Sequence, residues 1–190
     1  MKTTVKKICL WAGAGLLVAA LVMLLWWQLD IRNSRQQAQD YVKTIESLIP
    51  TPQGAVPEER WDNTMAVLSI EGTDFIGILE IPRFESVLPV AADWGKQYPC
   101  RFNGSIYDGS LQIGATTQKG QFDFYREICV GDRVCFTDME GNRYSYEVTD
   151  LRYEEHADQE TLTREEAALT LFIKNEYAFE YIVAFCNSLH

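Results

Sequence analysis

The chain has 190 residues, of which 47% are hydrophobic and 23% charged, so its composition fits neither global disorder nor a coiled coil. The first 28 residues contain three lysines and no acid, so residues 29–190 hold 14 basic against 27 acidic residues, a net charge of −13. A field of this sign repels phosphate backbones, which excludes nucleic acid as a partner.

Residues 8–27 predict a membrane-spanning helix. They carry no charge, are rich in Leu, Val and Ala, and end in Trp26 and Trp27. Twenty helical residues span roughly 30 Å, the thickness of a bilayer's hydrocarbon core, whereas the apolar core of a signal peptide has only about 7–15 residues. We therefore expect an uncleaved signal anchor over residues 8–28. The lysines place residues 1–7 in the cytoplasm and the rest of the chain outside the cell membrane, at the cell surface.

The segment after the anchor, residues 29–58, is expected to hold a helix and a linker. Residues 30–49 lack turn residues and place apolar side chains at helical intervals, which predicts a juxtamembrane helix that ends at Pro50. Three prolines and one glycine within residues 50–57 then predict a stiff, extended linker.

The outer domain, residues 59–190, is predicted to be mostly β. Its β-rich segments, separated by turn residues, are 67–70, 75–81, 87–90, 111–114, 133–137, 143–151, 169–173 and 181–185. We expect a hairpin at residues 71–74, turns at Asp108-Gly109 and Gly141-Asn142, and a short helix near residues 121–127. About eight short strands with few helices predict a closed or sandwiched β domain.

Cysteine and histidine counts limit the metal and disulfide chemistry. Cys9 falls in the predicted span, and the four outer cysteines are Cys100, Cys129, Cys135 and Cys186. Four cysteines allow three pairings, and the sequence does not choose among them, although Cys129 and Cys135 flank a Gly-Asp turn that would permit a local bridge. With only His156 and His190 outside, we expect no metal site and no cofactor.

Four segments in the outer domain carry a resemblance to a known family. They are FIGILEIPRFESVLPV (75–90), LQIGATTQKGQF (111–122), ICVGDRVCFTDMEGNRYSYEV (128–148) and LTLFIKN (169–175). Together and in this order they resemble the sortases, cysteine transpeptidases of the Gram-positive cell surface, in particular the class B-like and class D-like branches. The resemblance covers about residues 65–186. It implies a closed β-barrel of about eight strands with short helices, behind an N-terminal transmembrane helix.

The catalytic residues of the family are not found at their positions. A sortase uses a Cys nucleophile, a His for proton transfer and an Arg that stabilises charge. By resemblance the His position falls on Thr116, the Cys position on Lys174, and the Arg position on Tyr181, or on Glu180 after a shift of one residue. Threonine does not titrate near neutral pH, and a protonated lysine is a poor nucleophile. The resemblance therefore implies a degenerate sortase that lacks the catalytic residues of the family. Whether it is an enzyme is uncertain, and the residues favour an inactive protein.

Other sites stay open in the sequence. A relocated thiol nucleophile, Cys100 or Cys186, would need His156 as its base, whereas the competing interpretation of both cysteines is structural. Five acidic residues between 150 and 160 are an alternative calcium site, but their spacing matches no defined calcium loop and favours a solvated acidic loop. Aromatic residues between 61 and 125, Trp94 among them, are expected mostly in the core, with some lining a peptide groove.

Three functions follow as hypotheses. The first is a catalytically silent sortase homologue that binds a peptide, the sorting segment of a surface-protein precursor, or another sortase. The second is an active cysteine transpeptidase or hydrolase whose thiol lies elsewhere. The third is a barrel used for structure or sensing, without a peptide groove.

Overall fold

The computed structural model describes residues 2–50, 62–95, 98–116, 122, 125, 127–164, 166–175 and 180–189. Its elements are, in chain order, α1 (Lys2–Leu48), β1 (Leu68–Ile70), β2 (Thr73–Ile81), the 3-10 turn η1 (Pro82–Phe84), β3 (Ser86–Ala91), β4 (Cys100–Asn103), β5 (Leu111–Thr116), β6 (Arg133–Asp138), β7 (Arg143–Glu154), α2 (Gln159–Leu162), β8 (Leu169–Asn175) and β9 (Glu180–Ser188).

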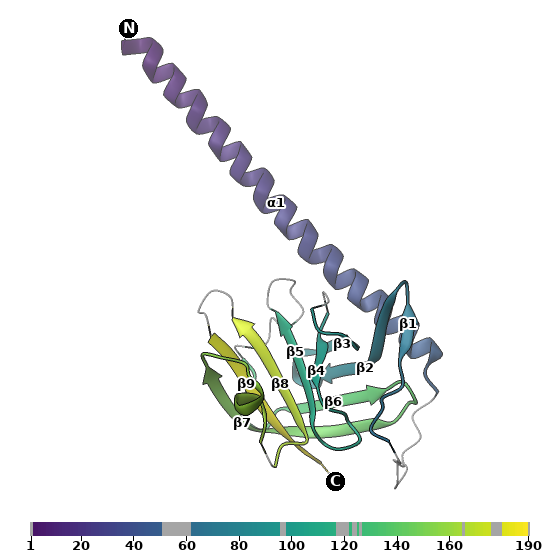
Figure 1. Ribbon diagram of the computed structural model, residues 1–190. Coiled ribbons are helices and arrows are strands. Elements are labelled where there is room, and N and C mark those ends of the chain that lie inside the picture. Colours follow the sequence, from purple (N-terminus) through teal and green to yellow (C-terminus); the bar gives the residue numbers. More distant parts are fainter. Residues whose placement is uncertain are drawn as a thin grey trace.

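The strands form one closed sheet. Eight strands follow one another in the order β2-β3-β4-β5-β8-β9-β7-β6, and β6 pairs again with β2, so the sheet closes into a barrel. The short strand β1 extends the sheet beyond β2 as a hairpin, as Figure 1 shows. The predicted fold, a closed barrel of about eight strands behind an N-terminal apolar helix, is confirmed.

All eight predicted strands are present, and their ends lie within three residues of the prediction. The predicted hairpin also forms, with Ile70 pairing Thr73 across the turn. Strand β4 escapes prediction because its four residues, CRFN, show no clear alternation, and its pairing with β5 makes it a strand. The short helix expected near residues 121–127 falls mostly outside the described residues.

Closure of the barrel depends on a glycine in β2. Gly77 pairs with Asp138 on β6, and a Cβ at position 77 would lie 2.4 Å from the carbonyl oxygen of Thr137 and from the ring of Phe136. Any larger residue would push the two strands apart. The interior that the closed sheet encloses is apolar and tightly packed, with Leu79 and Phe136 fully buried.

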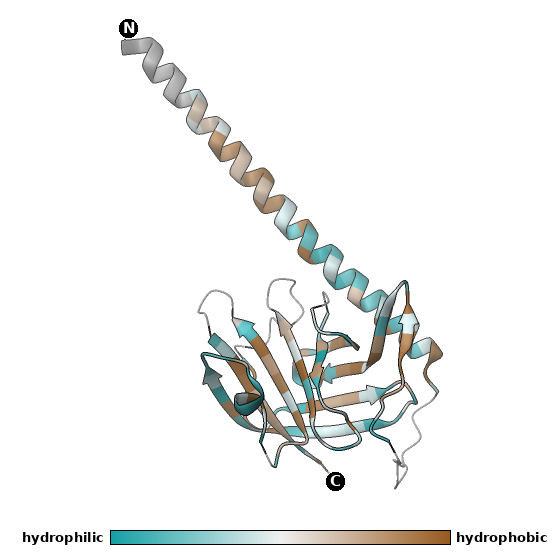
Figure 2. Cartoon of the chain, in the orientation of Figure 1, coloured by the Kyte–Doolittle hydropathy of each residue, from teal (hydrophilic) through white to brown (hydrophobic). Residues whose placement is uncertain are grey.

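The N-terminal helix α1 is continuous over 47 residues and joins the predicted span and the predicted juxtamembrane helix. From Trp11 to Leu29 it is mostly apolar and exposed, and Figure 2 shows the change to polar residues that follows. The part from Trp11 onward has the length and hydropathy of a membrane-spanning helix, with none of its apolar window buried against the barrel. An N-terminal apolar helix that could anchor the chain in a membrane is therefore present.

The second half of α1 packs on the outside of β2 and β3. Its buried residues recur every three or four positions, which is the spacing of one helix face: Ser34, Ala38, Tyr41, Val42 and Ile45. The ring of Tyr41 lies 5.2 Å from that of Phe75 and 5.5 Å from that of Tyr98, and its hydroxyl donates to Glu71 at 2.9 Å. The helix is thus docked through an apolar and aromatic contact, which we call the docking cluster.

Replacing Ile45 with alanine should destabilise the barrel, because Ile45 is fully buried in the docking cluster and its loss leaves a cavity. We expect Ile45→Ala to lower the free energy of unfolding by about 2–4 kcal/mol. Thermal and denaturant unfolding of the full chain in detergent measure this. Leu48→Ala is the matched control, since Leu48 lies on the same helix but is 59% exposed, and a change of less than about 0.5 kcal/mol is expected. Equal effects of the two variants would contradict a docked helix.

Candidate functional site

Strand register brings the three positions that the resemblance singles out into one line. Thr116 at the end of β5 pairs with Lys174 on β8, and Lys174 pairs with Tyr181 near the start of β9. On the other side of Tyr181 lies Glu154, the last residue of β7. These four positions form what we call the terminal row, at one end of the barrel. Glu180, the alternative to Tyr181, pairs with Asn175 one step beyond the row.

The terminal row belongs to the outer surface of the barrel. On β8 the alternate residues Leu169, Leu171 and Ile173 lie in the main core. Phe172 therefore points outward, and Lys174, two residues further, shares its side and is exposed. Tyr181 also packs on the outer cluster, half-buried, at 6.4 Å from the ring of Phe172. The side chain of Thr116 lies outside the described part of the structure.

Beside the row, aromatic rings cover the outer face. Phe172 stacks with Trp94 at 5.5 Å, and Phe102 meets both rings edge-on, at 5.3 Å and 5.2 Å. This outer aromatic cluster requires Gly114 beneath it, because a Cβ there would lie 2.4 Å from the rings of Phe172 and Trp94. Phe172 is 1% exposed, whereas Trp94 is 51% exposed, so the cluster presents Trp94 to its surroundings.

The segment that connects β7 to β8 covers the other part of this face. Leu162 of α2 is fully buried against Val183 and Phe185 on the outer side of β9. Gln112 on β5 holds the segment, since its Nε2 donates to the carbonyl oxygen of Leu162 at 3.1 Å and to Thr163 Oγ1 at 3.2 Å. The outer face is therefore filled by the chain itself along β9 and is more open toward the terminal row.

Acidic residues of the same region serve structural roles. Asp150 binds Arg152 at 3.0 Å and also pairs with Arg164, and the hydrogen bond from Arg152 lowers its pKa. Asp158 caps α2, and the hydrogen bonds from Thr161 lower its pKa. No group of three or more metal-ligating side chains occurs among the described residues. The acids therefore do not converge as a calcium site would require.

The structure places the two alternative nucleophile candidates, Cys100 and Cys186, in buried positions. Cys186 lies in the main core with no exposed surface, and burial raises the pKa of its thiol. Cys100 lies in the docking cluster beneath α1, where its Sγ donates to the carbonyl oxygen of Tyr98 at 2.9 Å. His156, the base that a relocated nucleophile would need, is exposed on the loop before α2, whereas both thiols are buried. The structural interpretation of both cysteines fits their burial.

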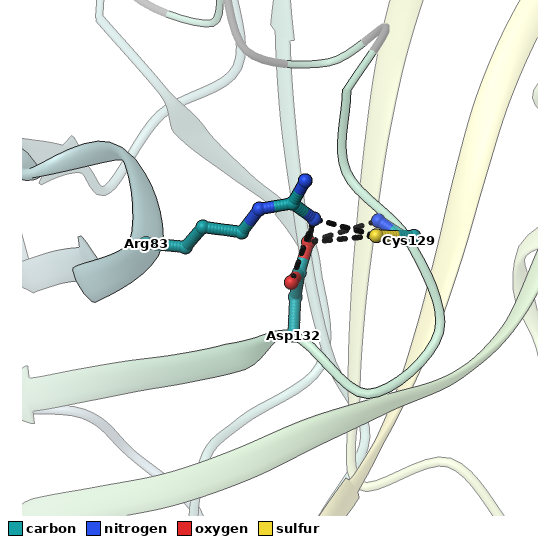
Figure 3. A network of polar contacts seen from close by, with 3 residues as sticks. All are labelled: Arg83, Cys129 and Asp132. Atoms are coloured by element: carbon teal, nitrogen blue, oxygen red, sulfur yellow. Dashed lines mark hydrogen bonds and ion pairs between the residues drawn. The ribbon is translucent and has the colours of Figure 1, made fainter.

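The accessible outer thiol is that of Cys129, which the sequence suggested only as half of a disulfide. Figure 3 shows it beside Arg83 and Asp132: Arg83 binds both carboxylate oxygens of Asp132, at 2.9 Å and 3.0 Å, and its Nη1 also contacts Cys129 Sγ. The hydrogen bond to Asp132 raises the pKa of Arg83. Arg83 stands 46 residues before Cys129, and no local pattern signals the contact.

Cys129 and Cys135, for which a local bridge was one open possibility, are both free thiols. Cys129 lies on the loop before β6 and is exposed, whereas Cys135 is buried within β6 and faces Ser145 on β7. Cys100 and Cys186, the other outer cysteines that the structure describes, do not form a disulfide either. Of the aromatic residues considered for a groove, Trp94 lies near the row, whereas Tyr98 belongs to the docking cluster and Phe122 to the core.

Solved structures similar to this barrel are sortases. A class D transpeptidase from Clostridium perfringens, sortase D5, is 12% identical with a TM-score of 0.53, over 61% of this chain and 79% of that one. Sortase C1 from Streptococcus agalactiae is 16% identical with a TM-score of 0.54, over 64% and 71%. A lid mutant of sortase A from Corynebacterium diphtheriae is 16% identical with a TM-score of 0.52, over 62% and 72%. No protein-family model and no curated protein matches the sequence. The fold is therefore sortase-like.

Thiol labelling tests the placement of the outer cysteines. In the folded full chain in detergent, a maleimide should modify Cys129 and leave Cys100, Cys135 and Cys186 unmodified, because these three are at least 93% buried. All four should react after denaturation. Peptide mapping by mass spectrometry assigns the sites, and Cys129→Ser removes the labelling of the folded outer domain as a control. Labelling of Cys186 as fast as that of Cys129 would refute its place in the core.

Proposed function

We propose that this chain is a membrane-anchored protein of sortase fold that does not catalyse transpeptidation and binds a peptide on the outer face beside the terminal row. Its ligand is a surface-protein sorting segment or a segment of another sortase. The observation that carries the proposal is the terminal row itself, in which Thr116, Lys174 and Tyr181 are adjacent by register.

Acyl transfer needs a nucleophile, a group that moves the proton and a charge stabiliser within reach of one another. Lys174 is exposed to water, whereas a lysine that acts as a nucleophile is desolvated in an apolar pocket or lies beside another cation. The two cysteines proposed as substitutes are enclosed in separate apolar clusters. The row therefore lacks the chemistry of a thiol enzyme but retains groups that bind.

Binding is supported by what lies next to the row. A cation at Lys174 and a hydroxyl at Tyr181 border the outer aromatic cluster, of which Trp94 is half exposed. An extended peptide is commonly recognised by such a combination, with apolar side chains on the aromatic surface and a carboxylate on the cation. Lys174 is the one basic residue of the terminal row, and its ammonium group would attract an acidic group of the ligand.

The N-terminal helix α1 supports the proposed membrane anchoring. The exposed apolar half of α1 has the dimensions of a membrane span, and Lys2, Lys6 and Lys7 precede it. By the positive-inside rule, residues 1–7 lie in the cytoplasm and the barrel lies outside.

An acyl-enzyme assay tests the absence of catalysis. The full chain in detergent is incubated with a pool of sorting-signal peptides, with and without reductant, and its intact mass is measured. We expect no covalent adduct, while an authentic sortase treated in the same way forms one. An adduct that maps to any cysteine of this chain would overturn the proposal and identify the nucleophile.

Charge reversal at the row tests the binding. Fluorescein-labelled sorting-signal peptides should bind the full chain saturably, and Lys174→Glu should weaken binding by roughly ten-fold or more, about 1.4 kcal/mol, through lost attraction. Arg133→Glu is the matched control, because Arg133 is also exposed but lies on β6, which takes no part in the row. Its affinity should stay within about two-fold. An unchanged affinity in Lys174→Glu would refute the site, and no binding by the unmodified chain would favour the structural or sensing barrel.

A further inference from the structure

The geometry of α1 leaves little room between a membrane and the barrel. From residue 16 to Leu48 the helix contains neither glycine nor proline, so its axis continues without a break from the apolar half into the docked half. Leu29 ends the exposed apolar run. Ser34 is the first buried residue on the helix face that packs against the barrel. Five helical residues advance by roughly 7.5 Å, which is close to the thickness of one headgroup layer.

Docking also fixes which part of the barrel faces the membrane. Buried contacts from Ser34 to Ile45 span three turns of the helix, so the barrel cannot tilt freely about α1. Figure 1 shows that the end of β5, the end of β8 and the start of β9 lie on the side toward which the apolar half of α1 projects. These strand ends are those of the terminal row. The opposite end faces away.

Exposed aromatic side chains gather at the same end. Outside α1, two aromatic residues of the described part of the chain are more than half exposed. They are Trp94, at 51%, and Tyr153, at 67%. Trp94 lies over Gly114 and Phe172, each two residues before the row on its strand. Tyr153 directly precedes Glu154 of the row. Tryptophan and tyrosine are the residues that prefer the interface between lipid and water.

We propose that this end of the barrel, through Trp94 and Tyr153, rests in the lipid headgroup layer of the membrane that holds α1. The partner is the bilayer surface, recognised by amphipathic rings rather than by charge. The outer domain is strongly acidic, so an electrostatic attachment to anionic lipid is unfavourable, and the short, hinge-free joint supplies the proximity instead. The inference rests on the membrane anchoring in the proposed function, and because Trp94 also belongs to the proposed peptide surface, a bound peptide and the bilayer would share this ring.

Depth-dependent quenching tests the contact in the full chain. The background carries Cys9→Ser and Cys129→Ser, which leaves three buried cysteines, and a single cysteine is introduced by Trp94→Cys or Tyr153→Cys and labelled with an environment-sensitive fluorophore. The protein is placed in nanodiscs of phosphatidylcholine and phosphatidylglycerol that contain headgroup spin labels. Tyr153→Cys carries the test alone if loss of the Trp94 ring unfolds the outer cluster.

Val130→Cys is the matched control. Val130 is 59% exposed and lies at the end of the barrel opposite the terminal row. Its neighbour Gly131 donates a backbone hydrogen bond to Val148. Val148 pairs with Cys186, which in turn pairs with Leu169, the first residue of β8. We expect quenching at positions 94 and 153 to exceed that at 130 by roughly two-fold or more, as for residues of an interfacial belt.

A label at Leu17→Cys, within the exposed apolar run, separates the two ways to fail. Acyl-chain spin labels should quench position 17 in every case in which α1 is inserted. Quenching at 94 and 153 no stronger than at 130, with position 17 quenched, would overturn the contact and leave the anchor intact. Loss of quenching at position 17 would refute the anchor itself, and with it the contact.

Discussion

The pairing of β2 with β6 is the contact on which the rest of the molecule depends, because it converts an open sheet into a barrel. Without it, β2 and β6 would each expose an unpaired edge. The same strand carries the docking of α1, since Phe75 and Ile78 face the helix while Leu79 faces the barrel interior. Closure of the sheet and attachment of the helix are therefore properties of one strand, and Gly77 stands in the middle of it.

Local patterns in the sequence predict the strands well, because alternation and turn residues act over short distances. Register is different: the adjacency of Thr116, Lys174 and Tyr181 arises from a parallel and an antiparallel pairing that no local pattern encodes. The resemblance named the three positions one by one, and only the pairing unites them. The contact between Arg83 and Asp132 spans 49 residues and has no sequence signal at all. Strand β4 was equally hidden, since its partner strand rather than its own residues makes it extended.

The end of β8 has one side in the barrel core and the other side exposed to solvent. Leu171 and Ile173 point into the core and hold the barrel together, whereas Lys174 lies on the outer side in water. At the exposed position of Lys174 the residue type can change without disturbing the interior, whereas Phe172 on the same side is buried in the outer cluster. Gly114 is also constrained on the outer side, because the rings of Trp94 and Phe172 occupy the space of its side chain.

Because α1 is uninterrupted, the number of residues between Leu29 and Ser34 determines how the barrel is rotated about the helix axis. Each added residue would turn the barrel by about 100° around the axis of α1 while raising it by only about 1.5 Å. A flexible tether would absorb such a change in length. Here the number of residues in the joint sets the azimuth of the barrel, so that only insertions close to whole turns, such as about seven residues, preserve the direction in which the barrel faces.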